Sequence, residues 1–383
     1  MKNKGLRRGL GSIIKSFDRE SIHPSPGLST TKKNLVYLAS YNVLPKRDQS
    51  HQKIIVPGSP PIWNCPPGKP LTVKPDSGLY FRDIHGHIFD WPFEPLFRAV
   101  LAMRRTLQMS DVDFVADRRN LMLLLQFVSG RNQPFRINID LVNSTALLST
   151  WVPRQRVSWV GAFDGYGREF EQQTTRKPFN MKTSVAHYQV VRFTLGGMNL
   201  IMRYEVDAYI PPSTNRPLQT TLRTRKYHAP TGMTVLRTGD TVARSGLVEI
   251  KTKNVHSSGP LLTVFGKLWL GQIPIYCKAM YTGNGEFLPP DLQYVEQSGR
   301  LAEWEIQNQD RLQKFICLLE MIKEAVRKTP HSKLSLVNEG DGVLKLFAAT
   351  RTASTGGVPK DLLKLWGAAQ TGKDTGSATT SGK

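Results

Sequence analysis

The stretch RYEVDAYI, residues 203–210, carries two acidic side chains at alternating positions of an otherwise apolar β-strand pattern. In an extended strand Glu205 and Asp207 point to the same face, and Val206 packs on the other face. Two like charges side by side repel each other unless a cation lies between them. The alternation therefore predicts a strand whose acidic face binds a cation.

A second alternating stretch, GLVEIKTK at residues 246–253, places Glu249 and Lys251 on one face and Ile250 on the other. If this strand neighbours the first one, three carboxylates and one ammonium meet on a single surface. Oxygen ligands of this kind suit a hard divalent cation, and the lysine can steady an attacking water or a developing oxyanion. This acid–x–lysine arrangement is typical of nucleases of the PD-(D/E)XK type. The alternative is a solvated strand face held by a cross-strand ion pair.

The rest of the chain is predicted to form a mixed α/β body. Residues 187–195 and 198–209 should form a β-hairpin, because Gly196 and Gly197 supply a two-residue turn. Apolar periodicity places helices and further strands along the sequence. The helices are expected at 93–105, 120–127 and 303–327, and the strands at 135–148, 155–163, 246–252, 261–269, 273–281 and 343–348. We therefore expect one α/β (mixed α+β) domain of two twisted mixed β-sheets flanked by helices, with disordered termini.

The composition is strongly basic, with 52 Lys and Arg residues against 30 Asp and Glu residues among 383 residues, a net charge of +22. A field of that sign attracts polyanions such as RNA or DNA. No run reaches the roughly 18–20 apolar residues of a membrane helix, so we expect no membrane partner. The three cysteines form no CxxC motif, which argues against a disulfide framework or a structural zinc site and favours a reducing intracellular compartment.

The motif Glu205-Val206-Asp207 followed by Glu249-Ile250-Lys251 resembles the DXO-like family. Members of that family are intracellular enzymes of RNA 5′ ends that remove defective caps or 5′ pyrophosphate, and some have 5′–3′ exonuclease activity. An upstream element, residues 167–171 (GREFE), resembles the family's Gly-x-x-hydrophobic-Glu motif and ends at Glu171, although Arg168 stands where an apolar residue is usual.

Two further segments support the resemblance more weakly. DVDFVADRRNLMLLLQF, residues 111–127, resembles the family's arginine before a leucine-rich helix, with Arg118 as the best match and Arg119 as the alternative. In residues 267–287 the family's usual glutamine is out of register. Lys267 falls nearest to its position, and Gln272 follows five residues later.

The resemblance implies a role for each of these residues. Glu171, Asp207, Glu249 and the backbone carbonyl of Ile250 would hold a divalent metal, Mg²⁺ or Mn²⁺. The same resemblance makes Glu205, Asp207, Glu249 and Lys251 catalytic, with Glu205 reaching a second metal or orienting water and Lys251 positioning the nucleophile. The substrate contacts would come from Arg118, Glu205, Lys251 and Lys267. The implied chemistry is in-line attack of metal-activated water on phosphorus.

The predicted domain organisation has three parts. Residues 1–33 are expected to be a basic flexible tail, residues 34–368 a decapping-nuclease-like catalytic domain, and residues 369–383 a disordered tail. Forty-one residues separate Asp207 from Glu249, more than the family resemblance leads us to expect. The excess is interpreted as an insertion at about 210–245, which is rich in arginine and carries the single acid Asp240. It either guides RNA or is a solvated loop.

Two other functions remain open on this sequence. The chain could be a different PD-(D/E)XK nuclease that acts on DNA, or a catalytically inactive RNA-binding or scaffold protein of the same fold. The family resemblance implies the 5′ end of RNA as the binding partner and a 5′–3′ exoribonuclease as a protein partner. It favours the nucleus over the cytoplasm, and the basic amphipathic start keeps the mitochondrion as a third alternative.

Overall fold

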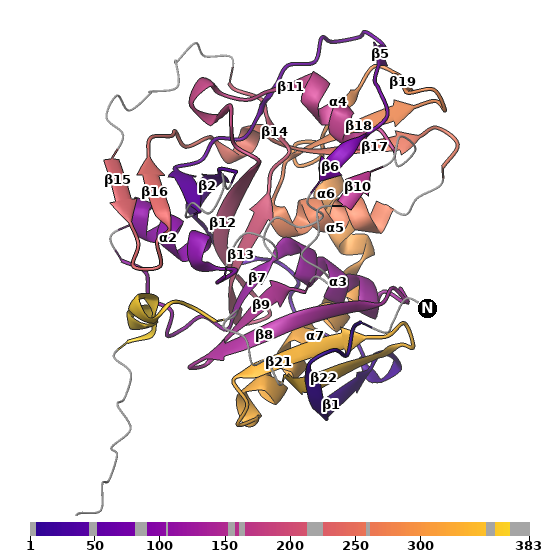
Figure 1. Ribbon diagram of the computed structural model, residues 1–383. Helices are drawn as coiled ribbons and strands as arrows, with labels where there is room; N and C mark the ends of the chain where they lie inside the picture. The colour runs from indigo at the N-terminus through magenta and orange to yellow at the C-terminus, as the bar shows by residue number, and fades with distance from the viewer. Residues whose placement is uncertain are drawn as a thin grey trace, which may run out of the picture.

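Two large mixed β-sheets form the framework of the protein (Figure 1). The computed structural model describes residues 5–45, 52–80, 90–104, 106–151, 158–160, 165–212, 225–257, 261–349 and 357–367. Within these residues one sheet has twelve strands and the other has eight, and each contains both parallel and antiparallel pairs. The predicted class, one α/β domain with two mixed sheets and flanking helices, is confirmed.

The twelve-stranded sheet runs from the N-terminal strand β1 to the strand β15 at its other edge. Its strands, in spatial order, are β1 (Leu10–Asp18), β22 (Val343–Ala349), β21 (Lys333–Asn338), β8 (Phe135–Val142), β9 (Thr145–Thr150), β7 (Phe114–Asp117), β13 (Met198–Glu205), β12 (Ala186–Leu195), β2 (Lys33–Val43), β3 (Lys53–Val56), β16 (Thr234–Arg237) and β15 (Arg225–His228).

The eight-stranded sheet is built from shorter strands around β17. Its members are β11 (Thr175–Arg176), β4 (Ile62–Trp63), β14 (Ala208–Tyr209), β17 (Leu247–Asn254), β18 (Ile275–Tyr281), β19 (Glu286–Phe287) and β5 (Leu71–Thr72), and β20 (Asp291–Tyr294) pairs with β18. A separate two-stranded sheet joins β6 (Gly78–Tyr80) to β10 (Ser158–Val160).

The helices pack on the sheets through apolar faces. They are α2 (Glu94–Met103), α3 (Arg118–Val128), α4 (Gly167–Thr174), α5 (Leu261–Gly271), α6 (Arg300–Gln307) and α7 (Gln309–Lys328). The largest core cluster joins α3, α5 and α7 through Leu121, Leu268 and Phe315, all fully buried. In Figure 1, α5 and α3 lie one below the other beneath the eight-stranded sheet. No helix in the described part of the chain has the length and apolar character needed to span a membrane.

The predicted hairpin of residues 187–209 is confirmed by β12 and β13, which pair antiparallel across Gly196 and Gly197. Both glycines have positive φ, +56° and +81°, a region that other residues enter with strain. A Cβ on Gly196 would also lie 2.2 Å from the Ile316 Cγ2 atom. The turn therefore requires glycine for backbone and packing reasons together.

Four predicted elements are wrong in type or extent. The strand predicted at 135–148 is an antiparallel pair, β8 and β9, and the strand predicted at 198–209 is described with the site below. Residues 261–269 form a helix, α5, instead of a strand, because Phe265, Leu268 and Trp269 recur at helical spacing and are buried together. Gly266 lets this helix cross α3 closely, since a Cβ there would lie 3.0 Å from Met122. The long helix expected at 303–327 is two helices, α6 and α7, because the backbone leaves the helical region at Asn308 (φ −114°, ψ 18°).

The flexible tail expected over residues 1–33 is wrong for β1. This strand pairs antiparallel with β22, and its Phe17 is buried in the main core. An edge strand needs a partner on one side only, so a weak apolar alternation is enough to hold it. Part of the expected insertion at 210–245 is also ordered, as β15 and β16. The tail expected at 369–383 lies outside the described residues.

Candidate active site

The candidate site lies where the chain passes from one large sheet to the other. Strand β13 ends at Glu205 in the twelve-stranded sheet, and β14 begins at Ala208 in the eight-stranded sheet. The expected single strand of residues 198–209 is therefore two strands in two sheets. Ala208 pairs with Val248 of the antiparallel strand β17. This pairing brings Asp207 beside β17, so the predicted neighbourhood of the two acidic motifs is present.

Glu249 is the centre of the charge cluster. Its side chain is fully buried on β17, and its Oε2 lies 2.9 Å from Arg118 Nη2. Its Oε1 lies 2.9 Å from Lys251 Nζ and 3.3 Å from Lys267 Nζ. Burial alone would raise the pKa of Glu249, but these three cations outweigh burial and hold the pKa well below its ordinary value. Glu249 is therefore an anion in the folded protein.

The Lys251 ammonium lies where three oxygens of the expected metal-binding set converge. Its Nζ is 2.9 Å from Glu249 Oε1, 3.5 Å from Asp207 Oδ2 and 2.6 Å from the carbonyl oxygen of Ile250. Asp207 is fixed there because its Oδ2 also accepts a hydrogen bond of 2.8 Å from the Ile250 N–H. Two carboxylates and one backbone carbonyl around one cation are a donor set that suits a hard divalent metal.

Glu171 and Glu205 add negative charge to the same cluster. Burial, followed by the neighbouring charge of Asp207, raises the pKa of Glu171 well above its ordinary value. Desolvation by the surrounding protein and then the charge of Asp207 raise the pKa of Glu205 to about 7, although Arg118 opposes them and the residue keeps exposed surface. Four carboxylates therefore share one electrostatic environment in which some resist ionisation. A divalent cation would relieve this repulsion, so the residues present fit the metal that the resemblance implies.

Arg118 reaches the cluster from the first turn of α3. Its guanidinium lies 5.5 Å from the centre of the Tyr204 ring, and its side chain is almost fully buried. Its Nη1 is buried without a hydrogen-bond partner in the described residues, so one donor remains for a ligand oxygen. The alternative residue, Arg119, is exposed on the helix. Of the two arginines, the structure places Arg118 against Glu249.

Of the two candidate residues in the segment 267–287, Lys267 also joins the cluster and Gln272 does not. Lys267 lies on α5 and directs its Nζ to Glu249, as described above. Glu249 alone would raise the pKa of Lys267, but Lys251, burial and Arg118 together lower it. Gln272 instead donates from Nε2 to the Trp269 carbonyl at 2.7 Å and closes the end of its own helix. Lys267 is therefore the residue of this segment that joins the cluster.

Asp76 is a residue of the site that sequence reasoning missed. Its carboxylate oxygens accept hydrogen bonds from the backbone N–H groups of Arg168 at 3.3 Å and Glu169 at 3.0 Å. Asp76 thereby caps the N-terminus of α4, the helix that carries Glu171. It lies more than ninety positions away in the sequence from the helix it caps, so no local pattern could have identified it.

Among the described residues no group of three Asp, Glu, His or Cys side chains has a ready-made metal-binding arrangement. The contacts explain this. The charged partners of Glu249 and Asp207 are the side chains of Arg118 and Lys251. A metal would have to take the place of the Lys251 ammonium. The lysine side chain is 31% exposed, so it has room to move.

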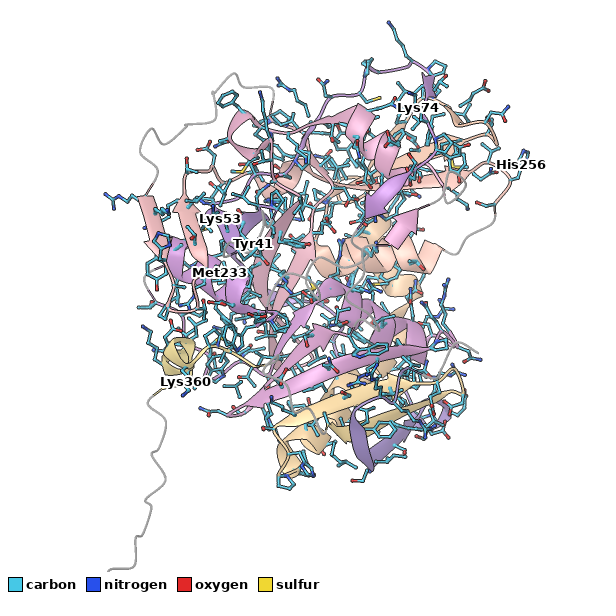
Figure 2. The ribbon with its side chains drawn as sticks, in the orientation of Figure 1. Tyr41, Lys53, Lys74, Met233, His256 and Lys360 are labelled. Carbon is cyan, nitrogen blue, oxygen red and sulfur yellow. The ribbon has the colours of Figure 1, made fainter. Side chains whose placement is uncertain are left out.

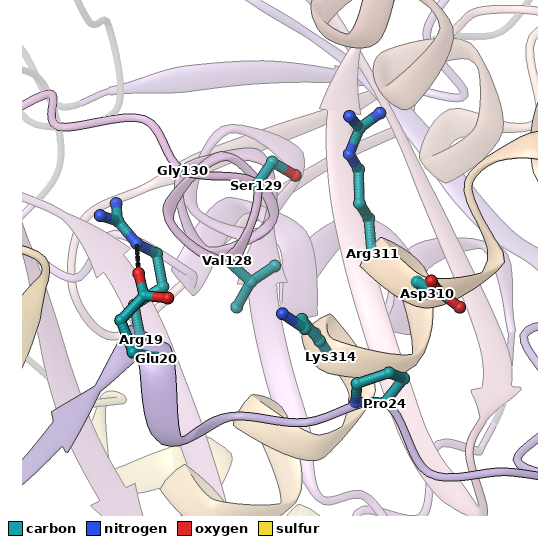
Figure 3. Close-up of a pocket in the computed structure, with 9 residues that line it drawn as sticks. All are labelled: Arg19, Glu20, Pro24, Val128, Ser129, Gly130, Asp310, Arg311 and Lys314. Carbon is teal, nitrogen blue, oxygen red and sulfur yellow. Dashed lines mark hydrogen bonds and ion pairs between the residues drawn. The ribbon is translucent and has the colours of Figure 1, made fainter.

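A separate pocket of about 380 Å³ lies between α3, α7 and the segment after β1 (Figure 3). It is lined by Arg19, Glu20, Asp310, Arg311 and Lys314 among others, and none of the cluster residues borders it. Arg19 is held there by Glu20 at 3.3 Å. The pocket lacks the convergent carboxylates, so the charge cluster is the stronger candidate for chemistry.

The fold and the cluster together define a mixed α/β protein with an acidic, lysine-bearing site at the junction of two sheets. The family model described as "Domain of unknown function (DUF8563)" matches residues 11–366. The chain belongs to this family. A search of curated proteins gives no match.

Solved structures with a similar fold carry the names Rai1 and Dxo1. Rai1 of S. pombe in complex with 3′-FADP is 16% identical, with a TM-score of 0.56 over 87% of this chain and 98% of that chain. Rai1 of Candida albicans in complex with pU5 and Mn²⁺ is 11% identical, with a TM-score of 0.56 over 88% and 93%. Dxo1 of K. lactis in complex with manganese is 10% identical, with a TM-score of 0.53 over 88% and 98%. The predicted resemblance to the DXO-like family is thus confirmed at the level of the fold.

Proposed function

We propose that this chain is a divalent-metal-dependent hydrolase that acts on the 5′ ends of RNA. The observation that carries the proposal is the convergence of oxygens from Glu249, Asp207 and Ile250 on one cation, the Lys251 ammonium. Two similar structures contain manganese, and one of these also contains pU5. The net charge of +22 supports binding to a polyanion.

The side chains around this point have different proposed roles. Glu171, Asp207, Glu249 and the Ile250 carbonyl would hold Mg²⁺ or Mn²⁺, which supplies Lewis-acid stabilisation of charge when bound. The Lys251 ammonium, displaced from the convergence point, orients the attacking water and offsets the negative charge that develops on the phosphoryl oxygens.

Three other side chains complete the site. Arg118 binds a phosphate oxygen through its unpartnered Nη1. Glu205, exposed beside Asp207, orients water or a second cation. Lys267 contacts the substrate from α5, beside Glu249.

The finer form of the proposal concerns substrate and setting. The reaction removes a defective cap or 5′ pyrophosphate, with 5′–3′ exoribonuclease activity as an extension of the same chemistry. A 5′–3′ exoribonuclease is the proposed protein partner, and the nucleus is the proposed place of action. These points rest on the DXO-like resemblance of the motifs around Asp207 and Glu249.

A hydrolysis assay on defined RNA 5′ ends tests the proposal. The substrates are 5′-triphosphate, unmethylated-capped, methyl-capped and 5′-monophosphate RNA, each with Mg²⁺, Mn²⁺ or chelator. We expect metal-dependent product from at least one 5′ end, lost in Glu249→Gln and kept in Glu303→Gln, an exposed glutamate on α6. No product from any 5′ end with either metal would refute the proposal, and cleavage confined to DNA substrates would favour the alternative nuclease.

A second candidate function is RNA binding without catalysis. The observation that favours it is the ion pairing of Glu249 with Arg118, Lys251 and Lys267, which balances the charge of this carboxylate without a metal. Calorimetric titration with Mn²⁺ separates the two functions. A catalytic site binds Mn²⁺ with loss of binding in Asp207→Asn, whereas the binding-only protein retains RNA and takes up no Mn²⁺.

A further inference from the structure

One edge of the twelve-stranded sheet carries an arrangement of like charges that is unfavourable by itself. Strand β15 lies at this edge, at the left of Figure 1, and all four of its residues are exposed. Arg225 of β15 lies directly opposite Arg237 of β16 in the antiparallel pair. Like charges in that position repel each other. A bound anion would turn this repulsion into a favourable interaction.

An exposed aromatic ring lies next to this edge. Phe179 follows β11 and is 85% exposed, the largest exposed fraction among the large hydrophobic side chains that the structure describes. Lys182 Nζ lies 4.7 Å from the centre of its ring. An unburied aromatic with a cation beside it is the combination on which nucleic-acid bases stack.

The ring and the charged edge belong to one continuous surface. Asn180 donates from Nδ2 to the carbonyl oxygen of Thr238 at 2.9 Å, and Thr238 directly follows Arg237. On the other side of β16, Lys53 of β3 pairs with Thr234 (Figure 2). Residues 52–58, 175–185 and 225–239 contain no Asp or Glu. The basic edge surface is defined by Arg176, Phe179, Lys182, Arg225, Lys226 and Arg237.

This surface begins close to the carboxylate cluster. Helix α4, which carries Glu171, leads directly into β11 and the Phe179 segment. Strand β11 is three positions from β17 in the eight-stranded sheet, in the order β11-β4-β14-β17. At about 4.8 Å between neighbouring strands, the separation is roughly 14 Å. A polymer held at Glu249 can therefore extend onto the basic edge surface.

We propose that the basic edge surface binds the single-stranded body of an RNA whose 5′ end lies at the carboxylate cluster. Phe179 stacks on a base, and the flanking lysine and arginine side chains contact successive phosphates. A protein partner is the weaker choice, because the surface offers repelling cations around two separate rings, Phe179 and Tyr227, and not an apolar patch. The choice of RNA as the ligand rests on the proposed function. The binding itself is argued from the residues of the basic edge surface.

Binding of single-stranded RNA without turnover tests the inference. Fluorescence anisotropy with 2-nucleotide and 20-nucleotide RNA in chelator, at several salt concentrations, excludes hydrolysis from the readout. We expect Phe179→Ala to weaken binding of the 20-mer by about five- to hundredfold, with Phe179→Trp restoring it. Arg225→Thr/Arg237→Thr should reduce the slope of log K against log salt by about 1.4. Neither change should affect the dinucleotide, which is too short to reach this surface from the cluster.

Matched variants on other surfaces control for general effects. Tyr294→Ala removes another exposed aromatic, and Arg8→Thr/Lys15→Thr removes two exposed cations at the opposite edge of the sheet. Unchanged 20-mer binding in the basic-edge variants, equal losses for both RNA lengths, or equal losses in the controls would each overturn the inference. If the basic-edge variants bind the 20-mer more weakly but the protein hydrolyses no RNA 5′ end, the RNA-binding surface is supported and the proposed hydrolase function is refuted.

Discussion

Two buried arginine–carboxylate contacts start from adjacent residues and differ in how their charges are balanced. Asp117 ends β7 and accepts a hydrogen bond of 2.7 Å from Arg203 Nε, and both side chains are almost fully buried. Arg203 also donates to the Pro92 carbonyl at 2.7 Å. The next residue, Arg118, begins α3 and shares Glu249 with two lysines. The first contact is one anion with one cation, and the second is a cluster.

The difference separates a structural ion pair from a reactive site. In the pair, one buried anion faces one buried cation, so the charges balance, although Asp117 Oδ2 and Arg203 Nη2 have no hydrogen-bond partner among the described residues. In the cluster, four carboxylates face three cations, and desolvation together with this surplus of negative charge raises the pKa values of Glu171 and Glu205. Imbalance of this kind is costly for folding and is retained where a ligand supplies the missing charge.

The largest expected effect concerns the stability of the structural pair. Arg203→Met should lower the free energy of unfolding by about 3–5 kcal/mol, because it leaves Asp117 buried and unpaired. Urea denaturation measures the loss. The double variant Asp117→Leu/Arg203→Met removes both charges and should regain most of it. A single variant within 1 kcal/mol of the wild type would show that the pair is not what holds this region.

Glu249→Gln should have its main effect on activity instead. It removes the anion that three cations share, and we expect hydrolysis to fall by at least about a hundredfold, equivalent to about 2.7 kcal/mol in the barrier. Steady-state kinetics on the preferred 5′ end measure this loss. Arg203→Met, assayed per folded molecule, provides the comparison and should stay close to the wild-type rate. Equal losses of activity in Glu249→Gln and Arg203→Met would contradict the assignment of the cluster as a reactive site and of the Asp117–Arg203 pair as purely structural.

Much of the site could be predicted from sequence because strand alternation encodes which side chains share a face. The alternation at Glu205 and Asp207 and at Glu249 and Lys251 predicted two acidic strand faces, which meet only if the two strands are neighbours. The family resemblance supplied Glu171, Arg118 and Lys267, all of which the structure brings to one cluster.

What the sequence could not predict depends on long-range packing. Short apolar runs are ambiguous between helix and strand, so α5 was predicted as a strand. The break between β13, which ends at Glu205, and β14, which begins after Asp207 in the other sheet, has no local signal in the sequence, because its alternation is that of one continuous strand. The Asp76 cap on α4 and the Lys251 ammonium at the convergence point likewise depend on tertiary contacts alone.

Divalent metal should stabilise the cluster by a smaller amount. At about ten times its dissociation constant, Mn²⁺ should raise the free energy of unfolding by ~1.4 kcal/mol. Denaturation with and without chelator measures this gain, which Asp207→Asn should abolish and the exposed Asp291→Asn should keep. Lys251→Met gives a sharper test, because removing the competing ammonium should tighten Mn²⁺ binding while hydrolysis is lost. Weaker Mn²⁺ binding in Lys251→Met would contradict the displacement of the lysine by metal.

The smallest expected effect is a pH dependence on the structural side of the junction. His187 of β12 accepts from the Val206 N–H at 3.2 Å through its carbonyl, and its Nδ1 lies 3.0 Å from Asn42 Oδ1. Burial lowers the pKa of His187 to about 3, against about 6.5 in the unfolded chain. The folded state therefore resists protonation, and the contribution to stability is present above pH 6.5 and is lost as the pH falls towards 3.

Between pH 6.5 and 5.5 the loss from His187 should be about 1 kcal/mol. The cluster works in the opposite direction, because the raised pKa of Glu171 makes its protonation at lower pH favour the folded state. The comparison of His187→Gln with the wild type isolates the histidine, since both proteins retain the same carboxylates. Unfolding free energies measured across this range should fall more steeply in the wild type. Parallel curves would mean that His187 is protonated without cost and that the two sides of the junction do not differ in their response to acid.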